Sequence, residues 1–195
     1  MNTVILVEIL LILLAIAGFV LRIGLSVWGI PLLILSLVGL AFMYFQRGLR
    51  PVRLNNQPTA ATDRYFMPAY KLGHFFFALC MLGVLFKVML WDANFLGLGV
   101  TLTLIFVLFV ALQVLKEKVF FKKLLVKSIL IGTTALVFYQ APLATFINIY
   151  YREHPQFAKV FIEYRKDPGN EMKKKNYLEA RKKLLNKNAK QPPLN

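Results

Sequence analysis

Few residues of this chain could do chemistry, and the most informative of them lie inside or beside long apolar runs. Glu8 lies in a leucine-rich stretch near the N-terminus, and His74 and Lys87 lie in a later one. Ionisable side chains within membrane segments are costly, and they often serve as proton sites or ion-pair partners. Each also has a simpler interpretation. Lys87 has a stem long enough to carry its ammonium to the interface, and Glu8 and His74 lie near the boundaries of their runs.

Two ion pairs within this small set are the alternatives to those simpler interpretations, which we favour. Glu8 would lie at a depth similar to that of Lys71 and His74, so it could pair with either of them. Lys87 could pair with Asp92 in the turn that follows it. The candidate functional residues in or beside the apolar runs are Glu8, Arg22, His74, Lys87, Trp91 and Asp92.

The sequence shows no signature of catalysis or of cofactor binding. None of its three aspartates adjoins a histidine or a nucleophile, and no HExxH, GxSxG or phosphate-binding glycine loop occurs. Cys80 is the only cysteine, which excludes an internal disulfide and argues against a thiolate metal site. His74 and His154 lie on different segments, without metal-ligand spacing. We therefore predict a protein that is not an enzyme and that has no cofactor and no metal.

The composition predicts a membrane protein. Hydrophobic residues make up 58% of the chain and charged residues only 17%, and the mean hydropathy is +0.59. The net charge of +15 comes from Lys and Arg clustered beside apolar runs, as in proteins oriented by the positive-inside rule and bound to anionic lipid. No separate basic helix with base-reading residues accompanies these clusters, so we expect no nucleic-acid partner.

The apolar runs predict an all-α polytopic membrane protein with about five transmembrane helices and a basic helical C-terminal tail. Each run is close to the roughly 20 residues that a helix needs to span the hydrocarbon core. The proline at position 142 would kink the fifth helix. The predicted segments are a first transmembrane hairpin (1–46), a basic loop (47–66), a second hairpin (67–115), a basic amphipathic segment (116–127), a fifth helix (128–150) and the tail (151–195).

The distribution of charge predicts an orientation in a bacterial inner membrane. The positive-inside rule places the loop 47–66 and the N-terminus in the cytoplasm. If the fifth run spans fully, the basic tail lies outside, against that rule; if it re-enters at Pro142, the tail stays inside. We favour five full spans and a periplasmic tail. The lysines of segment 116–127 are expected to contact anionic phospholipids; they are Lys116, Lys118, Lys122, Lys123 and Lys127.

Two short stretches suggest an internal repeat. The sequence GFVLRIGL at 18–25 aligns with GVLFKVML at 83–90, with a glycine, a cation and a leucine in equivalent places and a tryptophan soon after each. Two copies of a two-span unit would have the same orientation in the membrane. Similar composition alone could also make two apolar hairpins look alike, so both interpretations stay open.

The second turn resembles the transmembrane hairpin of the GldL family of gliding-motility proteins from Bacteroidota. That hairpin has a Gly-x-Leu-Phe-Lys-x-x-x-Trp turn with Ala-Asn nearby, matched here by Gly83, Lys87 and Trp91 within residues 70–110. The family drives type IX secretion and gliding, and the resemblance implies an inner-membrane location and a common ancestry of the hairpin. The family's motor also has a carboxylate in the second span, and none occurs here around Leu104 and Ile105. The resemblance therefore does not imply a motor.

These observations support two main hypotheses of function. The first is a non-catalytic accessory or structural subunit of a bacterial inner-membrane complex, linked to protein secretion, gliding or envelope assembly, with other membrane proteins as partners. The alternative is a small ion-coupled transporter or channel-like protein that uses Glu8, His74 and Lys87. A membrane enzyme acting on lipids would need a convergent acid–base set that the sequence does not provide.

Overall fold

The structure is a computed structural model that describes residues 3–49, 66–91, 94–116 and 121–189. These residues form helices and no strand, which confirms the predicted all-α fold. Five of the helices are long and apolar enough to cross a membrane, which indicates a membrane-embedded protein. Those five are α1 (Thr3–Ile23), α2 (Gly29–Leu49), α4 (Phe66–Val88), α5 (Asn94–Leu115) and α6 (Lys122–Gln140).

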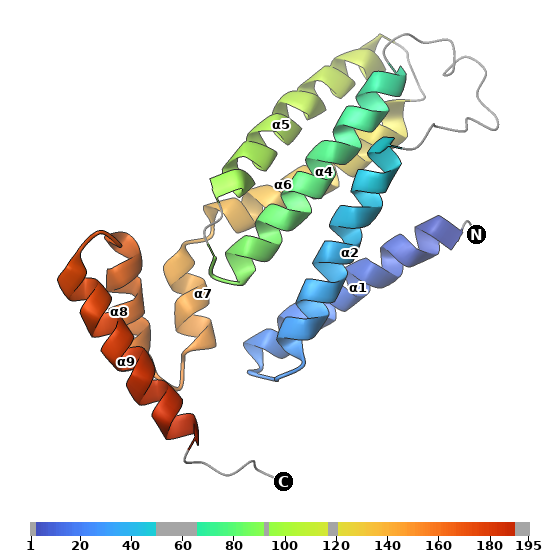
Figure 1. Cartoon of the computed structure of the whole chain (residues 1–195). Coiled ribbons are helices and arrows are strands. Elements are labelled where there is room, and N and C mark those ends of the chain that lie inside the picture. The colour runs from blue at the N-terminus through green and yellow to red at the C-terminus, as the bar shows by residue number, and fades with distance from the viewer. Residues whose placement is uncertain (1–2, 50–65, 92–93, 117–120, 190–195) are drawn as a thin grey trace. The chain divides into compact units, whose positions relative to one another are not determined.

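The five long helices form one compact unit, with α4 at its centre (Figure 1). Helix α4 packs against α2, α5 and α6, whereas α1 packs mainly against α2. As a result, 56% of the apolar window of α4 is buried inside the bundle, compared with 6% of that of α1. Helix α1 is apolar on all sides, and a helix of that kind is stable only if lipid or protein covers it.

The two hairpins of the predicted repeat have matching boundaries. Helices α1 and α4 end at Ile23 and Val88, and α2 and α5 begin at Gly29 and Asn94. The interval from Ile23 to Val88 equals the interval from Gly29 to Asn94. Both intervals equal the shift in residue number that aligns 18–25 with 83–90.

The backbone of the two turns is also the same. In each turn, two N–H groups just past the helix end bond back to carbonyls of the last turn, in the pattern of a Schellman cap. The residue that adopts the left-handed conformation is Leu25 (φ 62°) in the first turn and Leu90 (φ 60°) in the second. Glycine is usual there, and a side chain costs about 1–2 kcal/mol. The bonds run from Leu25 to Arg22 (3.1 Å) and from Ser26 to Leu21 (2.9 Å), and from Leu90 to Lys87 (3.1 Å) and from Trp91 to Phe86 (2.9 Å).

Equivalent glycines allow the helices of each hairpin to approach closely. A Cβ on Gly18 would lie 2.9 Å from the backbone nitrogen of Leu33 on α2. A Cβ on Gly83 would lie 2.7 Å from the Cα of Leu96 on α5. Small residues commonly serve this purpose where membrane helices cross. The aligned glycines therefore have the same role in both hairpins.

The structure places the fifth membrane helix differently from the sequence-based prediction. Helix α6 begins at Lys122 rather than at 128, so part of the predicted surface segment 116–127 is the start of a spanning helix. The predicted helix 128–150 is interrupted at Ala141, whose ψ of 123° is not helical. The cause is Pro142, because proline disfavours the helical conformation of the residue before it. Helix α7 (Leu143–Tyr150) follows this break.

The second compact unit, residues 142–195, contains the predicted basic helical tail. Helices α8 (Pro155–Lys166) and α9 (Glu171–Ala189) form a hairpin held together by aromatic side chains. Tyr177 of α9 stacks on Tyr164 and Phe161 of α8, with ring centroids 4.8 and 5.1 Å away. Most charged side chains of both helices lie outside this small aromatic core, whereas Arg165 is half-buried over the ring of Phe161.

The close approach at Gly83 predicts that even a single methyl group there will destabilise the bundle. We expect Gly83→Ala to lower the free energy of unfolding by about 1–3 kcal/mol, because the new Cβ meets the backbone of α5. The measurement is reversible unfolding in mixed micelles. Gly24→Ala is the matched control, since its Cβ would make only ordinary contacts, 3.4 Å or longer. Equal losses in both variants would contradict this role of Gly83.

Candidate functional site

Glu8 is the centre of a charged cluster that joins three helices. Its carboxylate on α1 accepts a hydrogen bond from the Tyr44 hydroxyl (2.8 Å) and another from Nη1 of Arg47 (2.8 Å), both on α2. The ammonium of Lys127 on α6 forms an ion pair with the same carboxylate. Because each of these bonds includes a charged group, they are stronger than bonds between neutral groups. The cluster therefore joins α1 to α2 and to α6.

The cluster is largely shielded and carries an excess of positive charge. The exposed fractions of the Glu8, Arg47 and Lys127 side chains are 14%, 17% and 24%. Two cations face one carboxylate, which leaves a formal charge of +1. Lys127 also lies over the ring of Tyr44, with its nitrogen 4.6 Å from the ring centroid, where the ring quadrupole attracts it. Tyr44 thus stabilises both the anion and one of the cations.

His74 on α4 lies beside this cluster, where it is 2% exposed. Its Nδ1 lies 2.8 Å from the carbonyl oxygen of Tyr70, and since a carbonyl only accepts, we assign the proton to Nδ1. The ring packs against Tyr70 and, edge to face, against Tyr44, with centroids 4.2 and 6.1 Å away. The ring of His74 therefore contacts Tyr44, which is hydrogen-bonded to Glu8, while the hydrogen bond of His74 goes to Tyr70 on its own helix.

The alternative partners considered for Glu8, His74 and Lys71, are wrong. Within the described residues, its bonds go to Tyr44, Arg47 and Lys127 instead of to His74 or Lys71. Sequence reasoning placed Arg47 in the loop 47–66 and Lys127 among the lipid contacts.

A helical pattern in the sequence could have placed Lys127 near the core. It lies beside Leu124, Ser128 and Ile131, which have helical spacing and form the buried stripe of α6. A helix beginning at Lys122 would therefore have put Lys127 next to that stripe. Because the predicted helix began at 128, Lys127 was assigned to the surface segment instead of to the helix.

The other intramembrane candidates lie far from Glu8. Lys87 is in the last turn of α4, thirteen residues after His74, which corresponds to about 20 Å along a helix. Arg22 is in the last turn of α1, at the end opposite Glu8. Trp91 is 53% exposed and packs edge-on against Phe86, at 5.1 Å. The set Glu8, His74 and Lys87 is thus not one site.

The remaining candidates lie at the surface or outside the described residues. Lys116, Lys122 and Lys123 are exposed near the junction of α5 and α6, where contact with anionic lipid stays a prediction. Asp92 and Lys118 lie outside the described residues, so the proposed pair of Lys87 with Asp92 stays a prediction too.

This arrangement is an ionic cross-link between α1, α2 and α6. We call it the charge clamp, and it consists of the Glu8 carboxylate with Tyr44, Arg47 and Lys127. Among the residues that the structure describes, no group of three or more His, Cys, Asp or Glu side chains could hold a metal ion. The Glu8 carboxylate is engaged by donors from two other helices, which suits it to holding those helices together.

Comparisons with protein-family models, curated proteins and solved structures find no match to this chain. The resemblance of the second hairpin to the GldL family therefore stays a prediction.

The clamp predicts that removing the charge of Glu8 will destabilise the bundle. We expect Glu8→Gln to lower the free energy of unfolding by about 2 kcal/mol, because it leaves Arg47 and Lys127 without their anion. The measurement is unfolding in mixed micelles, and the exposed Lys122→Gln, which lies outside the cluster, is the control. The exposed change should shift stability by less than about 0.5 kcal/mol.

A double-mutant cycle isolates the pair between α1 and α6. Once Glu8→Gln is present, Lys127→Met should cost less than it does alone, because its ion-pair partner is already gone. Additive losses would contradict a direct interaction between the two side chains.

Proposed function

We propose that this chain is a non-catalytic accessory subunit of a bacterial inner-membrane complex. In this proposal the five-helix bundle anchors the protein, and the α8–α9 hairpin docks other components. The observation that carries the proposal is the charge of α9, which has seven Lys or Arg residues and two Glu residues within Glu171–Ala189. Such a concentration of one sign of charge attracts acidic partners and steers their association.

The arrangement of the hairpin supports docking. Its aromatic side chains are occupied in holding α8 against α9, so the hairpin has a defined shape. Lys174, Lys175 and Lys182 of α9 are exposed. A basic helix on a folded hairpin presents its charges in a fixed pattern, which favours recognition of an acidic protein surface over loose attraction to any anion. We therefore expect the partners to be proteins of the same membrane complex.

The proposed orientation follows from the distribution of cations between the two ends of the bundle. The ends of α2 and α5 and the starts of α4 and α6 carry Arg47, Lys71, Lys116, Lys122, Lys123 and Lys127. The opposite ends carry Arg22 and Lys87. The positive-inside rule favours the first end, which includes the N-terminus, in the cytoplasm. Five crossings then favour a periplasmic tail. A role in secretion, gliding or envelope assembly rests on the GldL resemblance alone.

Ion-coupled transport is the second candidate, and one observation favours it. Glu8 and His74, two titratable groups inside membrane helices, both contact Tyr44. Proton-coupled transport would require Glu8 to release its proton during the cycle, so Glu8→Gln should abolish a flux measured in proteoliposomes. We expect no such flux from the wild-type protein; a flux that depends on Glu8 would replace the subunit proposal.

The docking role predicts that partners will be lost when the charge of α9 is reversed. Tagged full-length protein is purified in mild detergent from its own host, and stoichiometric partners are identified by mass spectrometry. We expect Lys174→Glu, Lys175→Glu and Lys182→Glu together to reduce recovery of the partners at least tenfold. The matched control replaces the same three lysines with arginine and keeps the charge, so recovery should be unchanged. Recovery of the chain alone from wild-type cells would contradict the proposal.

A further inference from the structure

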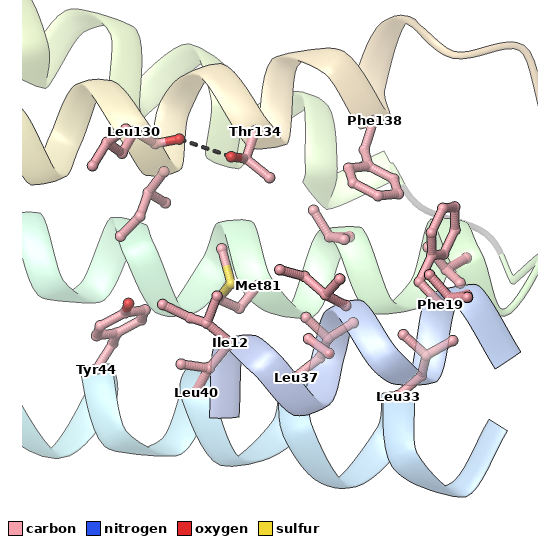
Figure 2. A pocket seen from close by; sticks show the side chains of 16 residues that line it. Ile12, Phe19, Leu33, Leu37, Leu40, Tyr44, Met81, Leu130, Thr134 and Phe138 are labelled. Atoms are coloured by element: carbon pink, nitrogen blue, oxygen red, sulfur yellow. Dashed lines mark hydrogen bonds between the residues drawn. The ribbon is translucent and has the colours of Figure 1, made fainter. Parts of the chain in front are cut away.

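An apolar cavity of about 550 Å³ lies within the membrane bundle, between α1, α2, α4 and α6 (Figure 2). Leu33, Leu37 and Leu40 of α2 and Met81 of α4 form part of its wall. Thr134 is one of its few polar lining residues, and its hydroxyl donates to the carbonyl of Leu130 (2.9 Å) on the same helix. The wall therefore offers a ligand little besides hydrocarbon, and an apolar cavity of this kind does not retain water.

Exposed residues of α1 and α6 are part of the cavity lining. Two contacts join these helices: the rings of Phe19 and Phe138, 5.7 Å apart, and the ion pair of Glu8 with Lys127. Between those contacts, lining residues also reach the outer surface of the bundle. Ile16 of α1 is 57% exposed and Leu130 of α6 is 64% exposed. A cavity bordered by exposed apolar residues of two membrane helices would be accessible from the hydrocarbon of the bilayer.

One end of the cavity is positively charged. Tyr44 lines that end (Figure 2), and its hydroxyl bonds to Glu8. Lys127 lies over the Tyr44 ring, and Arg47 follows Tyr44 on the next turn of α2. With two cations and one carboxylate, this end carries an excess positive charge. The opposite end, at Phe19 and Phe138, is aromatic and uncharged.

We propose that the cavity binds an acyl chain of an anionic phospholipid. The chain enters between α1 and α6, and the phosphate lies at the end with Arg47 and Lys127, where its charge balances the excess positive charge. The volume is within the range of about 300–1,000 Å³ that is usual for small-ligand sites. A partner's helix is about 10–12 Å across with its side chains, too wide for this space. A flexible chain fits, and its anionic headgroup complements the cluster.

The test fills the cavity and measures bound lipid. Full-length protein is purified from nanodiscs of phosphatidylglycerol and phosphatidylcholine, and its retained lipids are counted by native mass spectrometry. Ala15 lines the cavity, whereas Ala17 is exposed on α1 outside it. We expect Ala15→Phe to reduce retained phosphatidylglycerol at least tenfold and Ala17→Phe to leave it unchanged. Equal retention by wild type and Ala15→Phe would overturn the proposal.

A second pair of variants guards against misfolding of the first. Thr134 lines the cavity and its neighbour Thr133, also exposed, does not. Thr134→Phe should displace the lipid while Thr133→Phe should not; loss of lipid in both, or in neither, would overturn the site.

The headgroup is tested separately. We expect wild type to prefer phosphatidylglycerol to phosphatidylcholine by about fivefold for each cation engaged, and equal retention of the two lipids would overturn the assigned headgroup site.

Discussion

A carboxylate within a membrane helix must be neutralised, and this requirement governs the position of α1. An unpaired charge at such a depth is costly, so Glu8 needs donors from its neighbours. Tyr44 and Arg47 on α2 and Lys127 on α6 supply them. Helix α1 is otherwise covered mainly by α2, and it is attached to α6 by the Glu8–Lys127 ion pair together with the Phe19–Phe138 contact.

This attachment also explains the cavity. Because α1 and α6 meet at Glu8–Lys127 and at Phe19–Phe138, the space between those contacts is not filled by protein. The same ion cluster that draws α1 toward α6 makes one end of that space cationic. A space that is cationic at one end and apolar along its wall therefore arises beside a structural clamp.

The two hairpins show how one local structure can serve two roles. Their turns share a hydrogen-bond pattern and a leucine with positive φ, at Leu25 and Leu90. Helix α4 nevertheless lies at the centre of the bundle, whereas α1 lies at its edge. The difference comes from the neighbours that each helix meets, because α5 and α6 pack against α4, whereas α1 packs mainly against α2 and reaches α6 through the Glu8–Lys127 ion pair and the Phe19–Phe138 contact.

Much of the fold could be predicted because hydropathy, turn residues and aligned glycines are local signals. Five membrane helices and the matching turns at 18–25 and 83–90 are visible in the sequence. The partners of Glu8 were not predictable, since a choice among Lys71, His74, Arg47 and Lys127 depends on which helices become neighbours. The start of α6 was placed too late because three lysines, Lys122, Lys123 and Lys127, mask the beginning of an apolar helix. A cavity is a gap in packing, and no pattern in the sequence encodes it.

These relations connect the membrane unit to the proposed roles of the protein. The clamp uses the intramembrane carboxylate for structure, which favours a subunit over a transporter. In the proposals made above, the basic α8–α9 hairpin is the surface for acidic partners and the cavity is the site for lipid. Of these features, the clamp is the one on which the position of α1 depends.

The most direct test is therefore the distance between α1 and α6 in the presence and absence of the Glu8 charge. Spin labels are placed at the exposed positions Leu13 and Ile129, with Cys80 replaced by alanine. Double electron–electron resonance then measures the distance between α1 and α6. Labels at Val38 and Leu72 on α2 and α4 serve as the control pair. We expect Glu8→Gln to lengthen and broaden the α1–α6 distance distribution while the control pair stays the same. An unchanged α1–α6 distribution would contradict the clamp.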